Sequence, residues 1–279
     1  MPATATSIEF TELSRIIVDA EKPLAFDSPD HLVPWGTANN NSRNYRFNEK
    51  IYQIYYSYAK PLRILDIGCA GGGFVKDCLD DGCFAIGLEG SDYSKKFKRA
   101  EWATSPSNLF TCDVTENYTV SIETNGKKEP VVFELVTSWE LMEHIAEDKI
   151  EAVAKYIKKH LAEHGLWIMS IATVDDIVNG VNLHQTVKPK EWWINRFEES
   201  GLYHLPAFID FFNTQFVRGG TKYSGPASHS FHLVLSADTA KAPAVPPTGI
   251  RDKLFDAWLG SNFQKTLKRW VMGASRKYS

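Results

Sequence analysis

Two acidic residues, Asp66 and Glu89, each end a short apolar run, and a glycine-rich loop lies between them. The loop reads LDIGCAGGGFV from Leu65 to Val75. Glycines let a backbone approach a ligand closely, and the free amides of a following helix point toward it. A carboxylate at Glu89, 21 residues after Gly68, can accept hydrogen bonds from two ribose hydroxyls. Asp66 would attract an ammonium group and repel a pyrophosphate. These residue types and spacings predict a ligand with a ribose and a cationic end.

Other ligands of glycine-rich loops fit less well. A P-loop needs Lys and then Ser or Thr after its last glycine, but Phe74 and Val75 follow Gly73. A dinucleotide loop has the pattern G-x-G-x-x-G, and positions 68, 70 and 73 hold Gly, Ala and Gly. S-adenosylmethionine carries a ribose and a cationic end and requires no phosphate, so it matches the two acids. A tight turn that binds nothing is the structural alternative.

The elements that must position these residues alternate along the chain. Strands are predicted at 63–68, 83–89, 108–113, 131–138, 166–172, 208–217 and 230–237. Helices are predicted at 48–60, 72–79, 94–102, 150–161 and 189–200. This alternation predicts an α/β fold with a parallel sheet and helices on both faces. No clear helix separates the last two strands, which predicts that they pair as an antiparallel edge.

Composition divides the chain into four parts. Residues 1–45 form an irregular lead-in or cap, 46–239 the α/β domain, 240–249 a Pro-rich linker and 250–279 a tail with two amphipathic helical faces. From Gly249 onward, seven Lys or Arg accompany two Asp. Basic amphipathic helices can lie on anionic membranes, dock on a partner or close over their own domain. Peripheral membrane or protein contact through 250–279 is therefore expected, with docking favoured over membrane contact.

Bulk composition bounds the partners and the compartment. The chain has 279 residues and a net charge of −3, so no basic field predicts nucleic-acid binding. No stretch of 18 apolar residues predicts a membrane span, and the first residues do not resemble a signal peptide. The four cysteines form no C-x-x-C pair. Reduced thiols in the cytoplasm are expected, with association at a membrane surface as an option.

Four segments in order carry a resemblance: LDIGCAGGG, GLEGS, TCDV and FELVTSWELMEHI. Together they resemble the motifs of the class I S-adenosylmethionine-dependent methyltransferases, and most of all the branch with ubiquinone-biosynthesis and sugar or small-molecule O-methyltransferases. The resemblance covers about Arg63 to Gly165 and extends more loosely to Ala237. It implies a Rossmann-like, seven-stranded, mostly parallel sheet with a reversed last strand. The family loop reads G-x-G, and Ala70 replaces its second glycine here.

The resemblance also implies where the cofactor binds. Its loop and strand-end residues are Asp66, Gly68, Cys69, Ala70, Gly72, Glu89, Gly90, Cys112, Asp113, Val114, Ser138, Trp139 and Glu140. The first loop would line the methionine part, Glu89 would hold the ribose, and Asp113 would meet the adenine amino group. Residues 138–140 would border the sulfonium. Structural alternatives are a turn role for Asp113, a core role for Trp139 and a gap-filling role for Cys69.

Histidines are the candidate bases for removing a proton from an acceptor hydroxyl near neutral pH. His144 follows the fourth strand of the domain and is the first choice, and His184 after the fifth strand is the second. For His144 the structural alternative is a residue that orders the loop, and for His184 it is a loop residue that contacts only the lid or solvent. Adjacent Asp175 and Asp176 are weak evidence for a metal, so a metal is expected to be absent.

Acceptor contacts are expected from the lead-in and from one helix. Trp35, Asn41, Asn44, Tyr45 and Trp192 supply stacking and hydrogen-bonding groups that suit a polyhydroxyl substrate. A turn-rich surface loop and a core tryptophan are the alternatives. The predicted activity is methyl transfer from S-adenosylmethionine, with S-adenosylhomocysteine as product, to a hydroxyl of a sugar, a glycan or another small molecule. N-methylation, a cofactor-binding pseudo-enzyme that acts as a scaffold, and a nicotinamide dehydrogenase are the alternatives.

Overall fold

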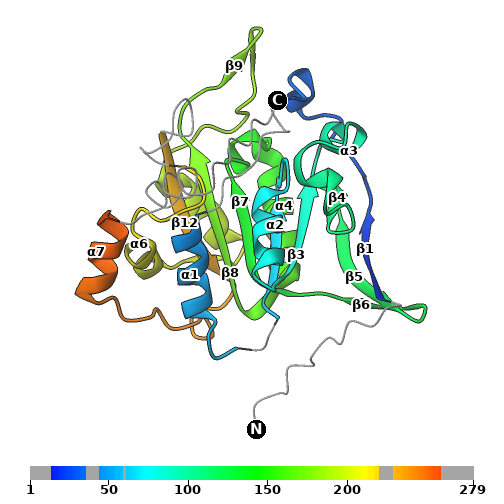
Figure 1. Cartoon of the computed structure of the whole chain (residues 1–279). Helices are drawn as coiled ribbons and strands as arrows, with labels where there is room; N and C mark the ends of the chain where they lie inside the picture. The colour runs from blue at the N-terminus through cyan, green and yellow to red at the C-terminus, as the bar shows by residue number, and fades with distance from the viewer. Residues whose placement is uncertain (1–13, 36–43, 59–60, 220–228, 259–279) are drawn as a thin grey trace, which may run out of the picture.

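A seven-stranded sheet forms the centre of the molecule in this computed structural model, which describes residues 14–35, 44–58, 61–219 and 229–258 (Figure 1). In spatial order its strands are β11 (Tyr203–His204), β12 (Ser230–Ser236), β8 (Leu161–Ala172), β7 (Phe133–Trp139), β2 (Arg63–Ile67), β3 (Phe84–Glu89) and β4 (Leu109–Thr111). β12 runs antiparallel to both of its neighbours, whereas β8, β7, β2, β3 and β4 pair in parallel. The predicted Rossmann-like sheet with one reversed strand is confirmed.

Helices cover both faces of this sheet. α1 (Tyr45–Ile54), α2 (Gly73–Asp80) and α6 (Pro206–Phe212) pack on one face, and α4 (Ile150–His160) and α5 (Lys190–Glu199) on the other. In Figure 1, α1 and α2 lie in front of the sheet and α4 lies behind it. Successive strand residues point to opposite faces of the sheet. Ile64 therefore packs in the core under α1, α2 and α6, and Leu65 packs in the core under α4 and α5. Because both faces are buried, the strands are apolar throughout.

The predicted strand at 208–217 is wrong. Its first part belongs to α6, which begins at Pro206, a residue that favours the first turn of a helix. Phe208, Phe211 and Phe212 follow the helical spacing i, i+3, i+4 and are buried. The partner of β12 is instead the two-residue strand β11, with Tyr203 opposite Ser236.

The predicted helix at 94–102 is also divided. It forms α3 (Tyr93–Lys96) and a separate 3-10 turn, η3 (Ala100–Ala103). Lys98 and Ala100 have positive φ values of 47° and 44°, which a continuous right-handed helix cannot include. The segment therefore connects β3 to β4 as two short turns of helix.

A second sheet, which the sequence patterns did not indicate, joins the lead-in to the domain. β1 (Ser14–Ala20) pairs antiparallel with β5 (Tyr118–Thr124), and β5 pairs with β6 (Lys127–Pro130). The lead-in is thus not irregular throughout. Asn125–Gly126 turns the chain between β5 and β6, and Asn179–Gly180 does so between β9 (Ile177–Val178) and β10 (Val181–Asn182). Asn-Gly is a strong local hairpin signal that could have revealed both hairpins.

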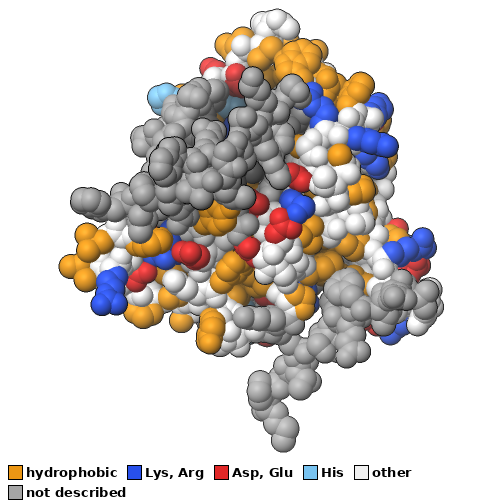
Figure 2. All heavy atoms as spheres, viewed as in Figure 1, with side chains coloured by type: hydrophobic (Ala, Val, Ile, Leu, Met, Phe, Trp, Pro, Cys, Tyr) orange, Lys and Arg blue, Asp and Glu red, His pale blue; other side chains and the backbone are white. Residues whose placement is uncertain are grey.

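The first helix of the tail, α7 (Ile250–Trp258), docks beside α1 (Figure 1). Arg46 and Lys50 of α1 both form ion pairs with Asp256, at 2.6 and 2.9 Å. Ile250 and Leu254 remain 77% and 55% exposed, and hydrophobic side chains gather over α7 in Figure 2. Docking therefore uses the acidic side of α7. The second predicted helical face, at 263–271, lies outside the described residues.

The rest of the described surface is mixed in charge. Figure 2 shows acidic and basic side chains interspersed on the face that it draws. No helix of the described ranges combines the length and the apolar character that a membrane crossing requires.

Candidate active site

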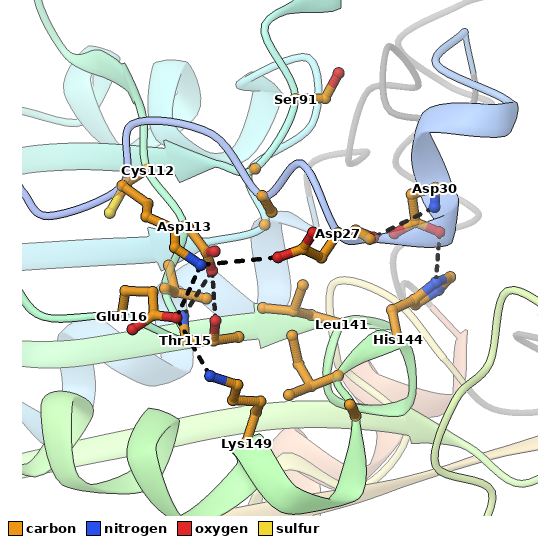
Figure 3. A pocket seen from close by; sticks show the side chains of 18 of the residues that line it. Asp27, Asp30, Ser91, Cys112, Asp113, Thr115, Glu116, Leu141, His144 and Lys149 are labelled. Atoms are coloured by element: carbon orange, nitrogen blue, oxygen red, sulfur yellow. Dashed lines mark hydrogen bonds and ion pairs between the residues drawn. The ribbon is translucent and has the colours of Figure 1, made fainter.

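A cavity of about 290 Å³ lies at the carboxyl ends of β2, β3, β4 and β7 (Figure 3). In an open parallel sheet this edge, beside the point where the strand order reverses, is the usual place for a ligand. The residues that line it are Lys22, Ala25, Asp27, Ser28, Asp30, His31, Gly68, Glu89, Gly90, Ser91, Cys112, Asp113, Val114, Thr115, Glu116, Leu141, His144, Ile145, Ala146, Asp148, Lys149 and Gln185. Seven of the predicted site residues are among them.

Glu89 ends β3 and places its carboxylate on the cavity wall. The backbone amides of Ala70 and Ser91 donate hydrogen bonds to its two oxygens, at 2.8 and 3.2 Å. Burial raises the pKa of Glu89 to about 7; these amides act against that rise and the charge of Asp30 adds to it. The carboxylate is thus held rigidly, and its charge depends on pH near neutrality.

The glycine-rich loop wraps around this carboxylate. Gly68 contributes to the cavity wall, while Ala70 has a φ of +48° and accepts a hydrogen bond from the Trp102 indole at 2.8 Å. The positive φ explains why a glycine is usual at this position of the family loop. Gly72 has a φ of +81°, and a Cβ there would lie 2.6 Å from Leu109 Cδ1. Gly72 therefore lets α2 start close against β4.

Asp66 lies behind the cavity and not on the part of its wall that the structure describes. The carboxyl is fully buried and accepts a hydrogen bond from Thr137 Oγ1 at 2.7 Å. Among the described residues its Oδ2 has no hydrogen-bond partner. Burial raises the pKa of Asp66 to about 7, the Thr137 hydrogen bond lowers it, and the charge of Glu89 raises it further. The two acids of the sequence pattern thus interact electrostatically across β2 and β3.

The segment after β4 forms the other wall. Cys112, Asp113 and Val114 all line the cavity, as does Gly90 after β3. The Asp113 Oδ1 atom accepts hydrogen bonds from the amide and hydroxyl of Thr115, at 3.0 and 2.7 Å. Asp113 thus orders its own turn and also faces the predicted adenine position.

The lead-in closes the cavity through described residues between Lys22 and His31. Of the predicted segment 35–45, the described residues Trp35, Asn44 and Tyr45 do not line it, and residues 36–43 lie outside the described ranges. The Asp113 amide donates to the Lys22 carbonyl oxygen, and the Ala25 amide donates to the Gly90 carbonyl oxygen, both at 3.0 Å. The side chain of Lys22 forms an ion pair with Glu116 at 3.2 Å. Figure 3 shows Lys149 beside the same carboxylate, also at 3.2 Å. Residues 22–31, here called the strap, could not be predicted from hydrophobic periodicity, because their contacts join segments far apart in the chain.

The predicted acceptor residues lie apart from this cavity as far as the structure describes it. Asn44 caps α1: its Oδ1 accepts from the amides of Arg46 and Phe47, and its Nδ2 donates to the Phe216 carbonyl. Its hydrogen-bonding capacity is therefore largely used within the fold, which leaves little of it for an acceptor.

The other predicted acceptor residues occupy several environments. Tyr45 begins α1 and is half-buried, and Trp35 is 57% exposed next to η1 (Pro29–Leu32). Trp192 lies between Lys188 and Arg196, each about 5 Å from its ring. Asn41 lies outside the described residues.

Residues around the end of β7 also differ from expectation. Ser138 accepts a hydrogen bond from the Trp167 indole at 2.9 Å, and Trp139 packs edge-on against Phe47 in the core. Cys69 is fully buried, in agreement with a gap-filling role. Glu140 has a φ of +53° and accepts from Ser230 Oγ at 2.8 Å. The backbone turns sharply here, so residues 138 and 139 face the core while Leu141 reaches the cavity.

His144 and His184 are brought together, as their candidate roles require. Their ring centroids lie 4.7 Å apart in an edge-on arrangement. His144 lines the cavity and its Nδ1 lies 2.9 Å from Asp30 Oδ1 (Figure 3). Burial lowers the pKa of His144, but the hydrogen bond and charge of Asp30 outweigh this effect, and the charges of Glu143 and Asp176 help raise the pKa to about 9.

The two rings therefore differ in charge. Burial lowers the pKa of His184, and the neighbouring charge of His144 lowers it further. At neutral pH His144 is a cation, which cannot take a proton, whereas His184 is neutral. Glu143, the middle residue of η4 (Met142–His144), is fully buried. Burial and then the charge of Glu140 raise its pKa to about 8. The order in which the sequence ranks the two histidines as bases is reversed by these charges.

The fold and this strand-end cavity define the class: the arrangement is that of a class I S-adenosylmethionine-dependent methyltransferase. Residues 40–214 match the family model described as “Methyltransferase domain”, and the chain belongs to this family. The cofactor of the family is S-adenosylmethionine. The residues fit it, because Glu89 presents a carboxylate beside Gly68, and Asp113 faces the same cavity.

Individual relatives are distant. The chain is 25% identical over 147 residues to the ubiquinone biosynthesis O-methyltransferase of Idiomarina loihiensis, a match that spans 46% of this chain and 57% of that protein. A methyltransferase structure from Clostridium acetobutylicum shares 13% identity, with a TM-score of 0.47 over 74% of this chain and 94% of its own. Magnesium protoporphyrin IX methyltransferase from Synechocystis, solved with S-adenosylhomocysteine, shares 11% identity. Its TM-score is 0.47, and the match covers 75% of this chain and 95% of that chain.

The pKa of Glu89 predicts how donor affinity depends on pH. A carboxylate accepts hydrogen bonds from ribose hydroxyls, but the protonated acid loses its charge and much of this capacity. With a pKa near 7, Glu89 is mostly protonated at pH 6 and mostly ionised at pH 8. The affinity for S-adenosylhomocysteine should therefore rise about tenfold over this range. Calorimetry at several pH values measures it, and the Glu89→Gln variant should lose the dependence. The same slope in that variant would assign the titration to another group, with Asp66 first.

Proposed function

We propose that the protein transfers a methyl group from S-adenosylmethionine to a hydroxyl of a small molecule. One observation carries this proposal: Glu89, Gly68 and Asp113 end consecutive strands of the sheet and face one cavity. The donor would supply a methyl group already activated on a sulfonium. The protein's own task is then to align the acceptor and to exclude water, which contributes on the order of 7–11 kcal/mol in favourable cases.

Polar side chains that line the cavity support a hydroxylated acceptor. Ser28, Asp30, His31 and Gln185 all line the cavity, and a sugar or another hydroxylated molecule offers matching donors and acceptors. A glycan end fits the same description. The relative from Idiomarina loihiensis is named as an O-methyltransferase, which favours oxygen as the methylated atom. N-methylation, and a protein that binds the donor without catalysis, are the alternatives.

Product formation with a panel of acceptors tests this proposal. The full chain is incubated with S-adenosylmethionine and with sugars, phenols, polyols or amines, and S-adenosylhomocysteine is quantified by mass spectrometry. We expect turnover with a subset of the hydroxylated acceptors and a product that is heavier by one methylene. Turnover with amines alone would establish the N-methylation alternative. Tight binding of S-adenosylhomocysteine without turnover on any acceptor would favour the binding protein.

We further propose a cytoplasmic location, because none of the four cysteines forms a disulfide, as is usual in a reducing compartment. Peripheral contact through the tail stays a proposal as well. It is supported by the outward position of Ile250 and Leu254 on α7, on the side away from the ion pairs with α1. Sedimentation with anionic vesicles, with Leu254→Ser as the comparison, tests this contact.

A further inference from the structure

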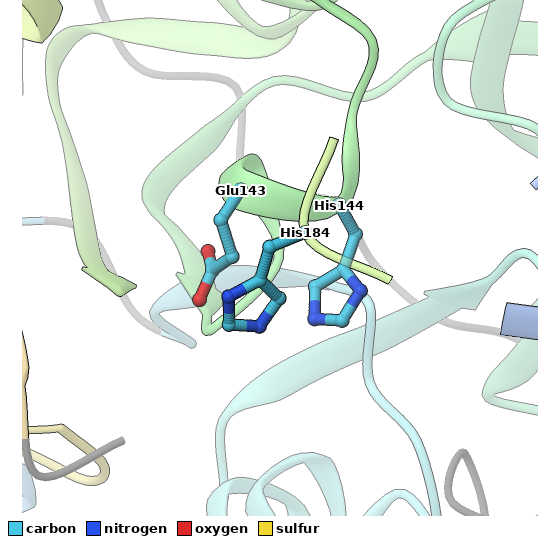
Figure 4. A group of neighbouring side chains, drawn as sticks. All are labelled: Glu143, His144 and His184. Carbon is cyan, nitrogen blue, oxygen red and sulfur yellow. The ribbon is translucent and has the colours of Figure 1, made fainter. Parts of the chain in front are cut away.

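Three potential metal ligands meet beside the cavity: Glu143, His144 and His184 (Figure 4). One ligand atom from each lies within 4.8 Å of the corresponding atoms of the other two. Glu143 and His144 belong to η4 after β7, and His184 belongs to the loop between β10 and α5. The two loops come from distant parts of the sequence, so the tertiary structure alone assembles the group.

Hydrogen bonds fix these loops against each other. Gln185 Nε2 donates to the His144 carbonyl oxygen at 2.6 Å, and the amide and hydroxyl of Thr186 donate to the carbonyls of Glu143 and Ile145, at 2.9 and 2.7 Å. The three side chains are thus held in place before any ligand binds. A metal site needs such preorganisation, because its ligands must keep a defined geometry.

Both imidazole rings are oriented as in metal-binding histidines. His184 Nδ1 lies 2.5 Å from the Val174 carbonyl oxygen, which can only accept, so this nitrogen carries the proton. His144 Nδ1 lies 2.9 Å from Asp30 Oδ1, and a carboxylate imposes the same arrangement. Histidines that bind metals almost always donate their other ring N–H to a carboxylate or a backbone carbonyl. The Nε2 atom of each ring is therefore the one available to a metal.

The acidic groups nearby lack the partners that buried carboxylates need. Glu143 is fully buried, and its Oε1 accepts from the Ala172 amide at 3.0 Å, but its Oε2 has no hydrogen-bond partner among the described residues. The Oε1 atom of Glu140 also has no hydrogen-bond partner among the described residues. The charge of Glu140 acts on the Glu143 carboxyl. Glu140 is only partly buried, so Glu143 is the fully buried acid here, and an oxygen of it without a partner is unfavourable unless a cation or a donor compensates it.

We propose that Glu143, His144 and His184 bind a divalent transition-metal ion. Two imidazole nitrogens and one carboxylate suit ions such as Mn²⁺, Fe²⁺ or Zn²⁺, and they leave coordination positions open. The ion would displace the second proton of His144, as binding to any protonated histidine requires. Sequence reasoning expects no metal because it considers Asp175 and Asp176. In the structure, Asp175 accepts a hydrogen bond from Asn182 at 2.8 Å and helps position the β9–β10 hairpin.

The position of the site indicates its use. His144 is on the cavity wall, so an ion bound to it would face the space left for the acceptor. A bound cation stabilises the anionic form of a coordinated hydroxyl, which would favour acceptors with an oxygen able to coordinate it. This consequence rests on the proposed methyl transfer, whereas the metal site itself does not.

Metal binding is measured on the full chain after treatment with EDTA and removal of the chelator. Titration with Mn²⁺, followed by the electron paramagnetic resonance signal of the free ion, should show one ion per chain, and Zn²⁺ should compete for it. Glu143→Gln and His184→Ala should each weaken binding by about 100-fold or more. Asp30→Asn, which keeps all three ligands, should weaken it by about 10–100-fold.

His204→Ala is the matched control, because His204 Nδ1 also contacts a backbone carbonyl, that of Val234 at 3.2 Å, but lies outside the cluster. It should bind Mn²⁺ like the wild type. Binding of S-adenosylhomocysteine by each variant checks that the fold is intact and separates this proposal from the methyl-transfer proposal. Less than about 0.1 ion per chain in a large excess of Mn²⁺, or unchanged binding in both ligand variants, would overturn the metal site. His144 would then be interpreted as a structural cation between Asp30 and Glu143.

Discussion

Glu89→Ala is expected to weaken the binding of S-adenosylhomocysteine by about 10–100-fold, the equivalent of roughly 1.5–3 kcal/mol for hydrogen bonds to a charged group. Two effects add in this variant. The ribose hydroxyls lose their carboxylate acceptor, and the amides of Ala70 and Ser91 lose the oxygens that hold the glycine-rich loop. Because Ala70 has a positive φ, the loop is strained and depends on this support.

Isothermal titration calorimetry at pH 8, where Glu89 is ionised, gives the largest difference between wild type and variant. Glu89→Gln should fall between them, since an amide oxygen can replace part of the acceptor function. Asp80→Ala is a suitable control, because Asp80 is an exposed acid on α2, which directly follows the loop. If Glu89→Ala binds S-adenosylhomocysteine with wild-type affinity, the donor does not bind beside Glu89 in this cavity, and the proposed function loses its basis.

Asp256→Ala is expected to lower the free energy of unfolding by about 3–5 kcal/mol, because it leaves a buried charge without its partner. The Lys50 side chain is 0% exposed, and Asp256 is 1% exposed and 2.9 Å from its ammonium group. Among the described residues the ammonium keeps a hydrogen bond to the Phe211 carbonyl at 2.6 Å and lies 4.6 Å from the Phe211 ring, and neither contact neutralises the charge. Denaturant unfolding followed by circular dichroism measures the difference.

Asp252→Ala gives the matched comparison on the same helix. Asp252 also pairs with Arg46, at 2.7 Å, but its side chain is 34% exposed. Its removal should therefore lower the free energy of unfolding by less than about 1 kcal/mol. Adding Lys50→Met to Asp256→Ala should recover part of the stability, since no unpaired ammonium is then left. If both single variants unfold within 1 kcal/mol of wild type, α7 is not docked on α1 in solution and the tail is available for other contacts.

The sequence identifies several residues of the candidate donor cavity because strand ends are local features. Glu89 and Asp113 directly follow apolar runs, and parallel strands bring their carboxyl ends to one edge of the sheet. Any correct assignment of β3 and β4 therefore places these side chains near Gly68. The same logic fails at Ser138 and Trp139, because a sharp turn at Glu140 decides which residue after β7 reaches the cavity.

Contacts between distant segments account for what the sequence patterns did not show. Asp30 and His144 are 114 residues apart, and Lys22 reaches Asp113 only because β1 pairs with β5. The strap over the cavity and the group formed by Glu143, His144 and His184 thus depend on loop positions that no periodicity encodes. By itself the sequence determines most strands of the central sheet, most of the helices and the acids at the strand ends, because hydrophobic spacing and turn residues act locally. The tertiary structure alone decides which side chains face each other across the loops, because loop conformation follows from packing between elements and not from local pattern.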